Sequence, residues 1–192
     1  FKSKVFFNSN NINKIDLRYR DFTNAFYLQT TVDKKFAFGF GLEHKNIRAS
    51  SDTFLTNNKE TFFDDSNYVN AFAFLKLDTF DKEQFPTRGF SADIGFKWYM
   101  WSDRDERLPK LDVNANGFNQ FSQIDGTISY ATTFWDKLTL QYTSEAGFTL
   151  GEEDTQVFDY RLGSYNKNFI NTFYSMYGYD VSELANQSFL RS

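Results

Sequence analysis

The side chains that could perform acid–base, nucleophilic or metal chemistry are few and poorly spaced for it. His44 is the only histidine, and the chain has no cysteine. This excludes a multi-histidine metal site and any thiolate ligand within these residues, and the strand phase of His44 favours an interfacial position over a role in a His-dependent triad. No Gly-x-Ser-x-Gly turn is present to expose a hydrolase nucleophile. The sequence therefore predicts no catalytic, cofactor-binding or metal-binding residue.

Two charged runs could bind ions, but their spacing favours a simpler role. The mixed run 103–107 (Asp-Arg-Asp-Glu-Arg) could meet lipopolysaccharide or divalent cations, although such runs are more often solvated loops. The acidic run 152–154 (Glu-Glu-Asp) lacks the alternating ligand spacing of a calcium loop. Both runs are interpreted as solubilising.

The composition limits the classes of protein that remain. The 192 residues are 41% hydrophobic and 20% aromatic, and their formal net charge of -4 argues against a nucleic-acid partner. A mean hydropathy of -0.56 beside so many aromatic rings requires apolar and polar residues to be finely interleaved. The longest nearly apolar run, residues 71–75, is far shorter than the ~20 residues of a membrane-spanning helix.

Apolar and polar residues alternate in four segments, which predicts β-strands with one apolar face. These segments are residues 36–42, 90–100, 124–134 and 138–150. Residues 68–80 read as a strand of mixed phase. The phase of residues 15–32 slips near Asp21, which leaves open one long strand with a bulge or two strands joined there.

The connections between these strands alternate between short and long. Residues 33–35, 82–88 and 136–137 are short, whereas 49–66, 103–119 and the segment from 152 onward are long. Outer-membrane barrels sort their turns and loops in this way, with the short turns in the periplasm. Residues 90–100, at ~3.3 Å per residue and a tilt near 45°, span roughly 25 Å of the bilayer normal.

The two faces of the strands are predicted to meet different solvents. The alternating apolar face carries no charge and should contact lipid, with His44 in an interfacial position near its loop end. The opposite face should line a watery interior with small and polar residues; its charged members Asp93, Lys97, Asp125 and Glu145 are expected to be hydrogen-bonded. The aromatic residues expected to form a girdle at headgroup level are Trp98, Tyr99, Trp101, Phe134 and Trp135.

One hairpin resembles a known family. Residues 77–90 contain Asp78, Asp81, Phe85, Pro86 and Gly89 in the order strand end, Phe-Pro-x-x-Gly turn and new strand. This pattern resembles the bacterial surface-antigen outer-membrane barrels, which include barrel-assembly insertases and two-partner secretion transporters. Pro86 suits a turn because its missing N–H costs nothing there, and Gly89 supplies backbone freedom.

A later segment resembles the long inward-folded loop of that family. Residues 162–180 end in Tyr-Gly-Tyr-Asp, where Gly178 and Tyr179 match the family pattern. Tyr177 stands where the family usually has arginine, so the salt bridge that this arginine makes is not expected here.

The finer resemblance is to the C-terminal barrels of patatin-like phospholipase proteins. It is carried by Leu28-Gln29-Thr30, Gly41 to Lys45, Ser144 to Phe148 and the Tyr-Gly-Tyr-Asp ending. The resemblance implies an all-β, antiparallel transmembrane barrel of about 16 strands. Residues 1–192 would form part of that single barrel domain, incomplete at both ends.

The resemblance implies a membrane anchor or export barrel for a lipid hydrolase whose active site would lie in a preceding domain. The alternatives are a barrel-assembly or translocation insertase, a passive porin or transporter, and a soluble β-sandwich binding module. The implied location is the outer membrane of a Gram-negative bacterium. The expected partners are outer-membrane lipid and lipopolysaccharide at the long loops, and assembly into a homo-oligomer or a larger membrane complex stays open. No cofactor is expected.

Overall fold

The computed structural model describes residues 2–5, 15–33, 35–51, 61–104, 118–135, 137–151, 158–163, 172–176 and 184–192. All of its regular elements in these ranges are β-strands, and no helix there is long and apolar enough to cross a membrane. The strands are β1 (Lys2–Val5), β2 (Ile15–Val32), β3 (Phe36–Ser51), β4 (Thr61–Asp78), β5 (Gly89–Ser102), β6 (Phe121–Phe134), β7 (Leu138–Leu150), β8 (Tyr160–Leu162), β9 (Phe173–Tyr174), β10 (Leu184–Asn186) and β11 (Ser188–Arg191).

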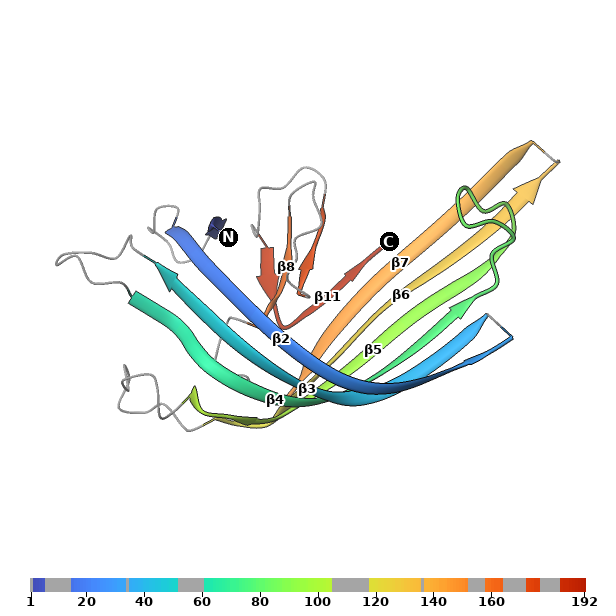
Figure 1. Ribbon diagram of the computed structural model, residues 1–192. Coiled ribbons are helices and arrows are strands. Elements are labelled where there is room, and N and C mark those ends of the chain that lie inside the picture. Colours follow the sequence, from blue (N-terminus) through green and yellow to red (C-terminus); the bar gives the residue numbers. More distant parts are fainter. Residues whose placement is uncertain are drawn as a thin grey trace.

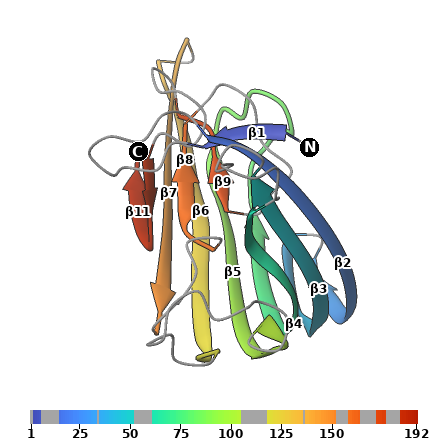
Figure 2. The ribbon, with the colours of Figure 1, turned by 90° about the vertical axis from the view of Figure 1, so that its left-hand side faces the viewer.

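Eight of these strands form one antiparallel sheet in the order β1-β2-β3-β4-β5-β6-β7-β11. The sheet bends into a deep trough, and β1 and β11 form its two edges, so it is not closed (Figure 1). A small sheet, β10-β8-β9, lies on the concave side of the trough (Figures 1 and 2). The predicted all-β, antiparallel architecture is therefore confirmed, in the form of a strongly curved sheet that is not closed.

The six central strands, β2 to β7, are 13 to 18 residues long. Strands in soluble proteins are typically about 5–6 residues long. β2 is a single strand, and its pairing with β3 runs without a register shift from Leu17 to Val32. Of the two interpretations of residues 15–32, one long strand is thus correct. The slip near Asp21 is not a bulge in this pairing.

The register shift with the largest consequence lies between β4 and β5. Asn70 pairs with Tyr99 and Val69 pairs with Trp101, so Met100 is the extra residue of a bulge. The bulge places Trp101 on the same face as Trp98, and the two side chains are 51% and 41% exposed. Strict alternation over residues 90–100 predicts Met100 as the next member of the face that contains Trp98, and the bulge brings Trp101 to that face.

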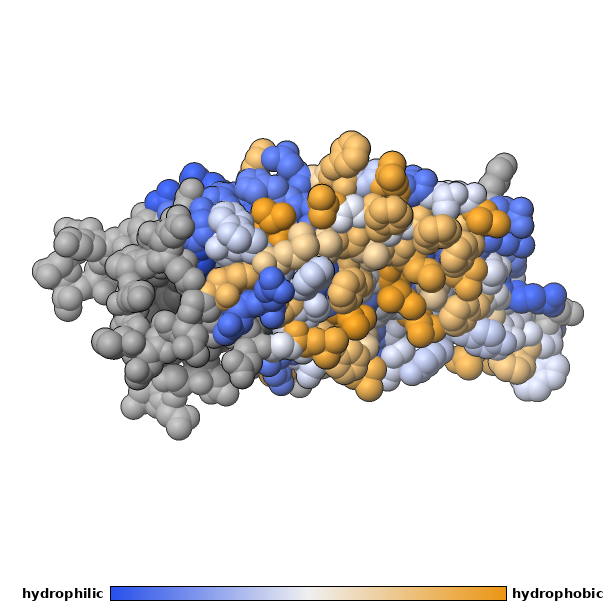
Figure 3. Space-filling view, turned by 90° about the horizontal axis from the view of Figure 1, so that it is seen from below, coloured by the Kyte–Doolittle hydropathy of each residue, from blue (hydrophilic) through white to orange (hydrophobic). Residues whose placement is uncertain are grey.

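The predicted apolar faces of the long strands form the convex surface of the trough. Phe26 is 80% exposed, Leu28 62% and Leu140 60%. Seen from below, this surface is a broad apolar band with hydrophilic residues toward both ends (Figure 3). Such a large exposed apolar surface is unfavourable in water and suits contact with acyl chains. The prediction that this face does not form the interior is confirmed.

The connections are sorted as the sequence predicts. The β2–β3 and β6–β7 turns have three residues each and are closed by backbone bonds from Lys35 N to Val32 O and from Lys137 N to Phe134 O, both 3.2 Å. Each turn begins with a residue at positive φ, Asp33 (52°) and Trp135 (51°). Because adjacent strands are antiparallel, these turns and the β4–β5 turn lie at one end of the sheet, hereafter the short-turn end.

Candidate functional site: the concave face and the segment folded onto it

The middle of the concave face carries a ladder of paired charges and amides. Lys97 on β5 lies 3.3 Å from Glu43 Oε1 on β3, and Asn70 on β4 donates to the same oxygen at 2.9 Å. On the β2 side, the buried Lys45 ammonium contacts Asp21 Oδ2 at 3.0 Å. Each contact joins different strands, so these side chains tie the sheet together across its width.

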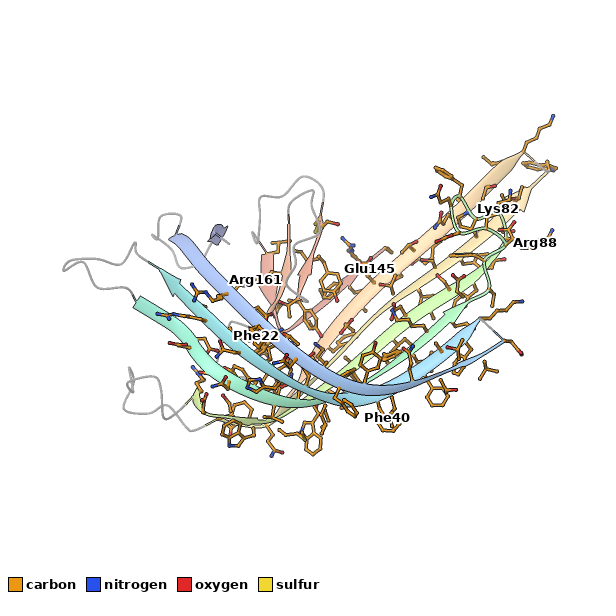
Figure 4. All side chains as sticks on the ribbon, viewed as in Figure 1. Phe22, Phe40, Lys82, Arg88, Glu145 and Arg161 are labelled. Carbon is orange, nitrogen blue, oxygen red and sulfur yellow. The ribbon has the colours of Figure 1, made fainter. Side chains whose placement is uncertain are left out.

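The ladder continues to β11 through Arg191. Its Nε donates to Glu145 Oε2 on β7 at 2.7 Å, and its guanidinium also donates to the carbonyl of Ser175. Ser175 belongs to the segment folded onto the concave face, where the Tyr174 hydroxyl bonds to Asp125. Arg191 thus joins β7, β11 and this inner segment, a role for which the sequence offered no motif. Figure 4 shows Glu145 on the concave side and Phe40 on the convex side.

Toward the other end of the strands, hereafter the long-loop end, the concave face is a packed aromatic core. Tyr68 is fully buried, and its ring lies 4.9 Å from that of Phe158 in an edge-to-face arrangement. Tyr99 is 2% exposed and stacks on Phe121 at 4.4 Å. The prediction of a watery interior lined by small residues is therefore wrong at this end. The assignment of Tyr99 to the girdle is also wrong, whereas Trp98, Trp101, Phe134 and Trp135 are exposed.

Glycine allows rings to lie directly on the sheet. A Cβ on Gly147 would come within 2.5 Å of the Phe189 ring and 2.7 Å of the Tyr160 ring. Tyr160, at the start of β8, also donates its hydroxyl to the Ile124 carbonyl at 3.1 Å. On β3, a Cβ on Gly39 would come within 2.6 Å of the Phe74 ring. On the concave face of these strands, Gly39 and Gly147 therefore leave the space in which an aromatic ring packs against the backbone.

The β4–β5 turn brings together the motif residues of the sequence. Asp81 accepts three hydrogen bonds, from Thr87 N (2.8 Å), Thr87 Oγ1 (2.5 Å) and Arg88 N (3.1 Å). Asp78 accepts from Phe80 N at 2.9 Å, and Pro86 is buried. Gly89 has φ 127°, and a Cβ there would come within 2.5 Å of the Thr79 carbonyl oxygen. Phe85, in contrast, is 88% exposed at φ 54°.

These hydrogen bonds make the turn sensitive to acid. Donation from the Thr87 hydroxyl and amide lowers the pKa of Asp81 from 3.8 to about 2. A carboxyl whose pKa is lower in the folded state stabilises the turn above pH 3.8, and this contribution is lost as the pH falls toward 2.

We expect the hydrogen-exchange protection of the Thr87 and Arg88 amides to fall between pH 3.8 and pH 2. Protection of Thr79, whose amide donates to Phe90 O, serves as the internal control. In Asp81→Asn the pH dependence should disappear, and a flat profile in the unaltered protein would contradict this account.

The other residues singled out from the sequence are dispersed. His44 is exposed on the convex face, and Asp93 pairs with Lys76 at 2.8 Å. Asp103 accepts from the Asn67 amide at 2.6 Å. Gly178, Tyr179, Tyr177, residues 105–107 and residues 152–154 lie outside the described residues. Within the described ranges no cluster of three or more His, Cys, Asp or Glu side chains could hold a metal ion.

Taken together, these contacts show that the concave face holds an inner segment in place. Sequence reasoning missed Arg191 and the aromatic core. The available signal was the set of aromatic residues out of phase with the apolar face, Tyr68 on β4, Tyr99 on β5 and Phe121 on β6.

The long strands, the lipid-compatible convex face and the sorted turns define a transmembrane β-barrel domain of the outer-membrane type. The model of the OMP85 superfamily matches residues 1–192, and the chain belongs to that superfamily. Its members are outer-membrane proteins of Gram-negative bacteria and organelles. Nothing matches the chain among the curated proteins or the solved structures.

Proposed function

We propose that this domain is the barrel of a patatin-like phospholipase-type protein in the outer membrane of a Gram-negative bacterium. The barrel would anchor or export a lipid hydrolase domain encoded elsewhere in the same protein. The described residues contribute no hydrolytic chemistry to this role. They provide a lipid-facing wall and an inner surface that holds a folded segment.

The observation that carries the proposal is where the resembling segments lie. Glu43, from the segment Gly41 to Lys45, bonds to Asn70 and Lys97. Glu145, from the segment Ser144 to Phe148, bonds to Arg191. Two of the segments that resemble the patatin-associated barrels therefore place a carboxylate in the polar network of the concave face, and Glu145 reaches the inner segment through Arg191, which also donates to the Ser175 carbonyl. This supports a resemblance that includes the interior and not only the general strand pattern.

The interior is less suited to a passive porin. Phe158 and Tyr160 are each 2% exposed on the concave face, and Gln123 Nε2 donates to the Phe158 carbonyl at 2.8 Å. Side chains and backbone of the inner segment thus fill the space beside β5 to β7 that an open channel would need.

A barrel-assembly or translocation insertase is the second candidate. It is supported by the Asp81-capped Phe-Pro-x-x-Gly turn, which resembles the whole superfamily and not one branch of it. Tyr177, in place of the usual arginine, counts against a standard insertase.

Reconstitution of the full-length protein into phosphatidylcholine vesicles separates the two candidates. The proposal predicts hydrolysis of a fluorogenic phospholipid, abolished by replacing the nucleophilic serine of the hydrolase domain and unaffected by Tyr142→Phe on the convex face. The absence of hydrolysis, together with faster folding of an unfolded barrel client added from urea, would overturn the proposal in favour of the insertase.

A further inference from the structure

The connection between β4 and β5, hereafter the strap, is longer than its place in the sheet requires. Its ten residues, 79–88, join neighbouring antiparallel strands at the short-turn end, where the β2–β3 and β6–β7 turns each need only three. Lys82 and Arg88 mark the strap in Figure 4. Most of its length is therefore not needed to join the two strands.

The strap folds onto the concave face of β6. The hydroxyl of Thr133, on the concave side of that strand, donates to the Thr87 carbonyl at 2.8 Å. Ala131, on the same face, is fully buried, although its cross-strand partner Gly89 has no side chain that could cover it. Pro86 in the strap is buried as well. The strap thus covers the concave face of β6 at the short-turn end.

The strap is rigid within itself but is joined to β6 by little. Asp81 accepts three hydrogen bonds from other residues of the strap. Phe85 is held at φ 54°, a conformation that phenylalanine keeps only where the surrounding structure imposes it. Within the described ranges, one hydrogen bond joins the strap to β6, that from Thr133. Gly89, at φ 127°, follows the strap and gives it a joint about which it can swing as a unit.

We propose that the strap closes the short-turn end of the barrel interior over β5 and β6, and that the Thr133–Thr87 hydrogen bond is its latch. In the outer-membrane orientation this end faces the periplasm. The aromatic core, in which Tyr99 stacks on Phe121, closes the same face toward the long-loop end. The polar stretch of β6 that contains Asp125 lies between the two closures, so access to it from the periplasm along β6 requires the latch to open. The proposal does not depend on what the barrel anchors or exports.

The test measures how fast a water-soluble maleimide labels an introduced cysteine in the full-length protein in detergent, read at each position by mass spectrometry of peptides. Ala131→Cys lies beneath the strap, whereas Gln141→Cys lies directly opposite it on β7, where the side chain is exposed. Ala131→Cys is expected to react about tenfold or more slowly than Gln141→Cys, because its reaction must wait for the strap to open.

Thr133→Val removes the latch and should accelerate labelling of Ala131→Cys about threefold to tenfold, the usual net worth of one hydrogen bond. Thr139→Val is the matched control. The Thr139 and Thr133 hydroxyls are 2.8 Å apart, so this variant removes a hydroxyl from the same chain of hydrogen bonds and leaves the latch in place. It should not change the rate.

A second measurement needs no introduced cysteine. Trypsin cleavage after Arg88, which lies in the strap, should be faster in Thr133→Val and unchanged in Thr139→Val. Ala49→Cys, only 1% exposed on the concave face toward the long-loop end, reports general loosening and should stay protected in Thr133→Val. Folding of each variant is checked by heat-modifiable mobility on a gel.

Three outcomes would overturn the proposal. Equal labelling of Ala131→Cys and Gln141→Cys would mean that the strap covers nothing. Unchanged labelling and cleavage in Thr133→Val, or equal acceleration in Thr139→Val, would mean that the Thr133 hydroxyl is not a latch. Equal acceleration at Ala49→Cys would mean that Thr133→Val loosens the whole barrel and does not release the strap.

Discussion

Ile94→Arg should lower the free energy of unfolding in a lipid bilayer by about 2–4 kcal/mol, the cost of a cation on the lipid face near the bilayer midplane. Ile94 lies in the middle of β5 on the convex face and is 41% exposed. In water the same replacement of an exposed side chain would be almost neutral. The size of the loss therefore reports which solvent the convex face meets.

The measurement is denaturant unfolding of the full-length protein in phosphatidylcholine vesicles, followed by tryptophan fluorescence. Thr127→Arg is the charge-matched control, because Thr127 lies on the concave face opposite Asp93. Thr127→Arg should cost much less than Ile94→Arg, because this part of the concave face already accommodates charge: Asp93 is more than half exposed and pairs with Lys76. Gly95→Ser, also on the concave face, should be mild: its Cβ would meet Asp125 Oδ1 at 3.3 Å, and this contact is with the end of a side chain, which can shift slightly, and not with backbone. Equal losses at Ile94 and Thr127 would contradict the assignment of the faces.

The convex half of the fold was predictable because lipid imposes a simple rule. Every lipid-facing position must be apolar, so the period of two is visible at Phe38, Phe40 and Leu42 without knowledge of any partner strand. The short turns were predictable for a related reason, since their residues must satisfy local backbone geometry. Both signals are local in sequence.

The concave half was not predictable because its packing depends on residues distant in sequence. Tyr99 looks like a girdle residue beside Trp98. Its burial is explained by Phe121 on the next strand and by Phe158, which the inner segment contributes. The bulge at Met100 was not predictable either, because one extra residue does not visibly change the pattern of a run that is aromatic on both faces. For the same reason Arg191 could not be recognised as the partner of Glu145, 46 residues away.

The OMP85 assignment and the aromatic core together explain why the interior departs from a simple channel lining. A barrel that only conducts water needs small polar side chains inside. A barrel that holds an inner segment needs packing partners for it, and Tyr160 finds them in Phe189 and in the surface exposed by Gly147. Glycine has a low strand propensity, but at position 147 its missing side chain provides the surface on which the rings of Tyr160 and Phe189 pack.

Tyr68→Ala tests whether this core is dry, and it should cost about 3–5 kcal/mol in the same unfolding measurement. The Tyr68 ring packs against Tyr99, Phe118 and Phe158, so its removal leaves a cavity. Its hydroxyl donates to Asp64 Oδ2 at 2.5 Å, and Asp64 is itself fully buried. Truncation therefore also deprives a buried carboxylate of its donor, which adds to the loss.

Tyr68→Phe separates the two contributions, because it keeps the ring and removes only the donor to Asp64. We expect a loss of about 1–3 kcal/mol, the cost of a buried acceptor left without its partner. Tyr142→Ala on β7 is the matched aromatic control, since Tyr142 is 55% exposed on the convex face and lipid can fill the space that it leaves. Its loss should be smaller than that of Tyr68→Ala. If the two truncations cost the same, water must already fill the long-loop end of the concave face, and the inner segment would then be held by its polar contacts alone.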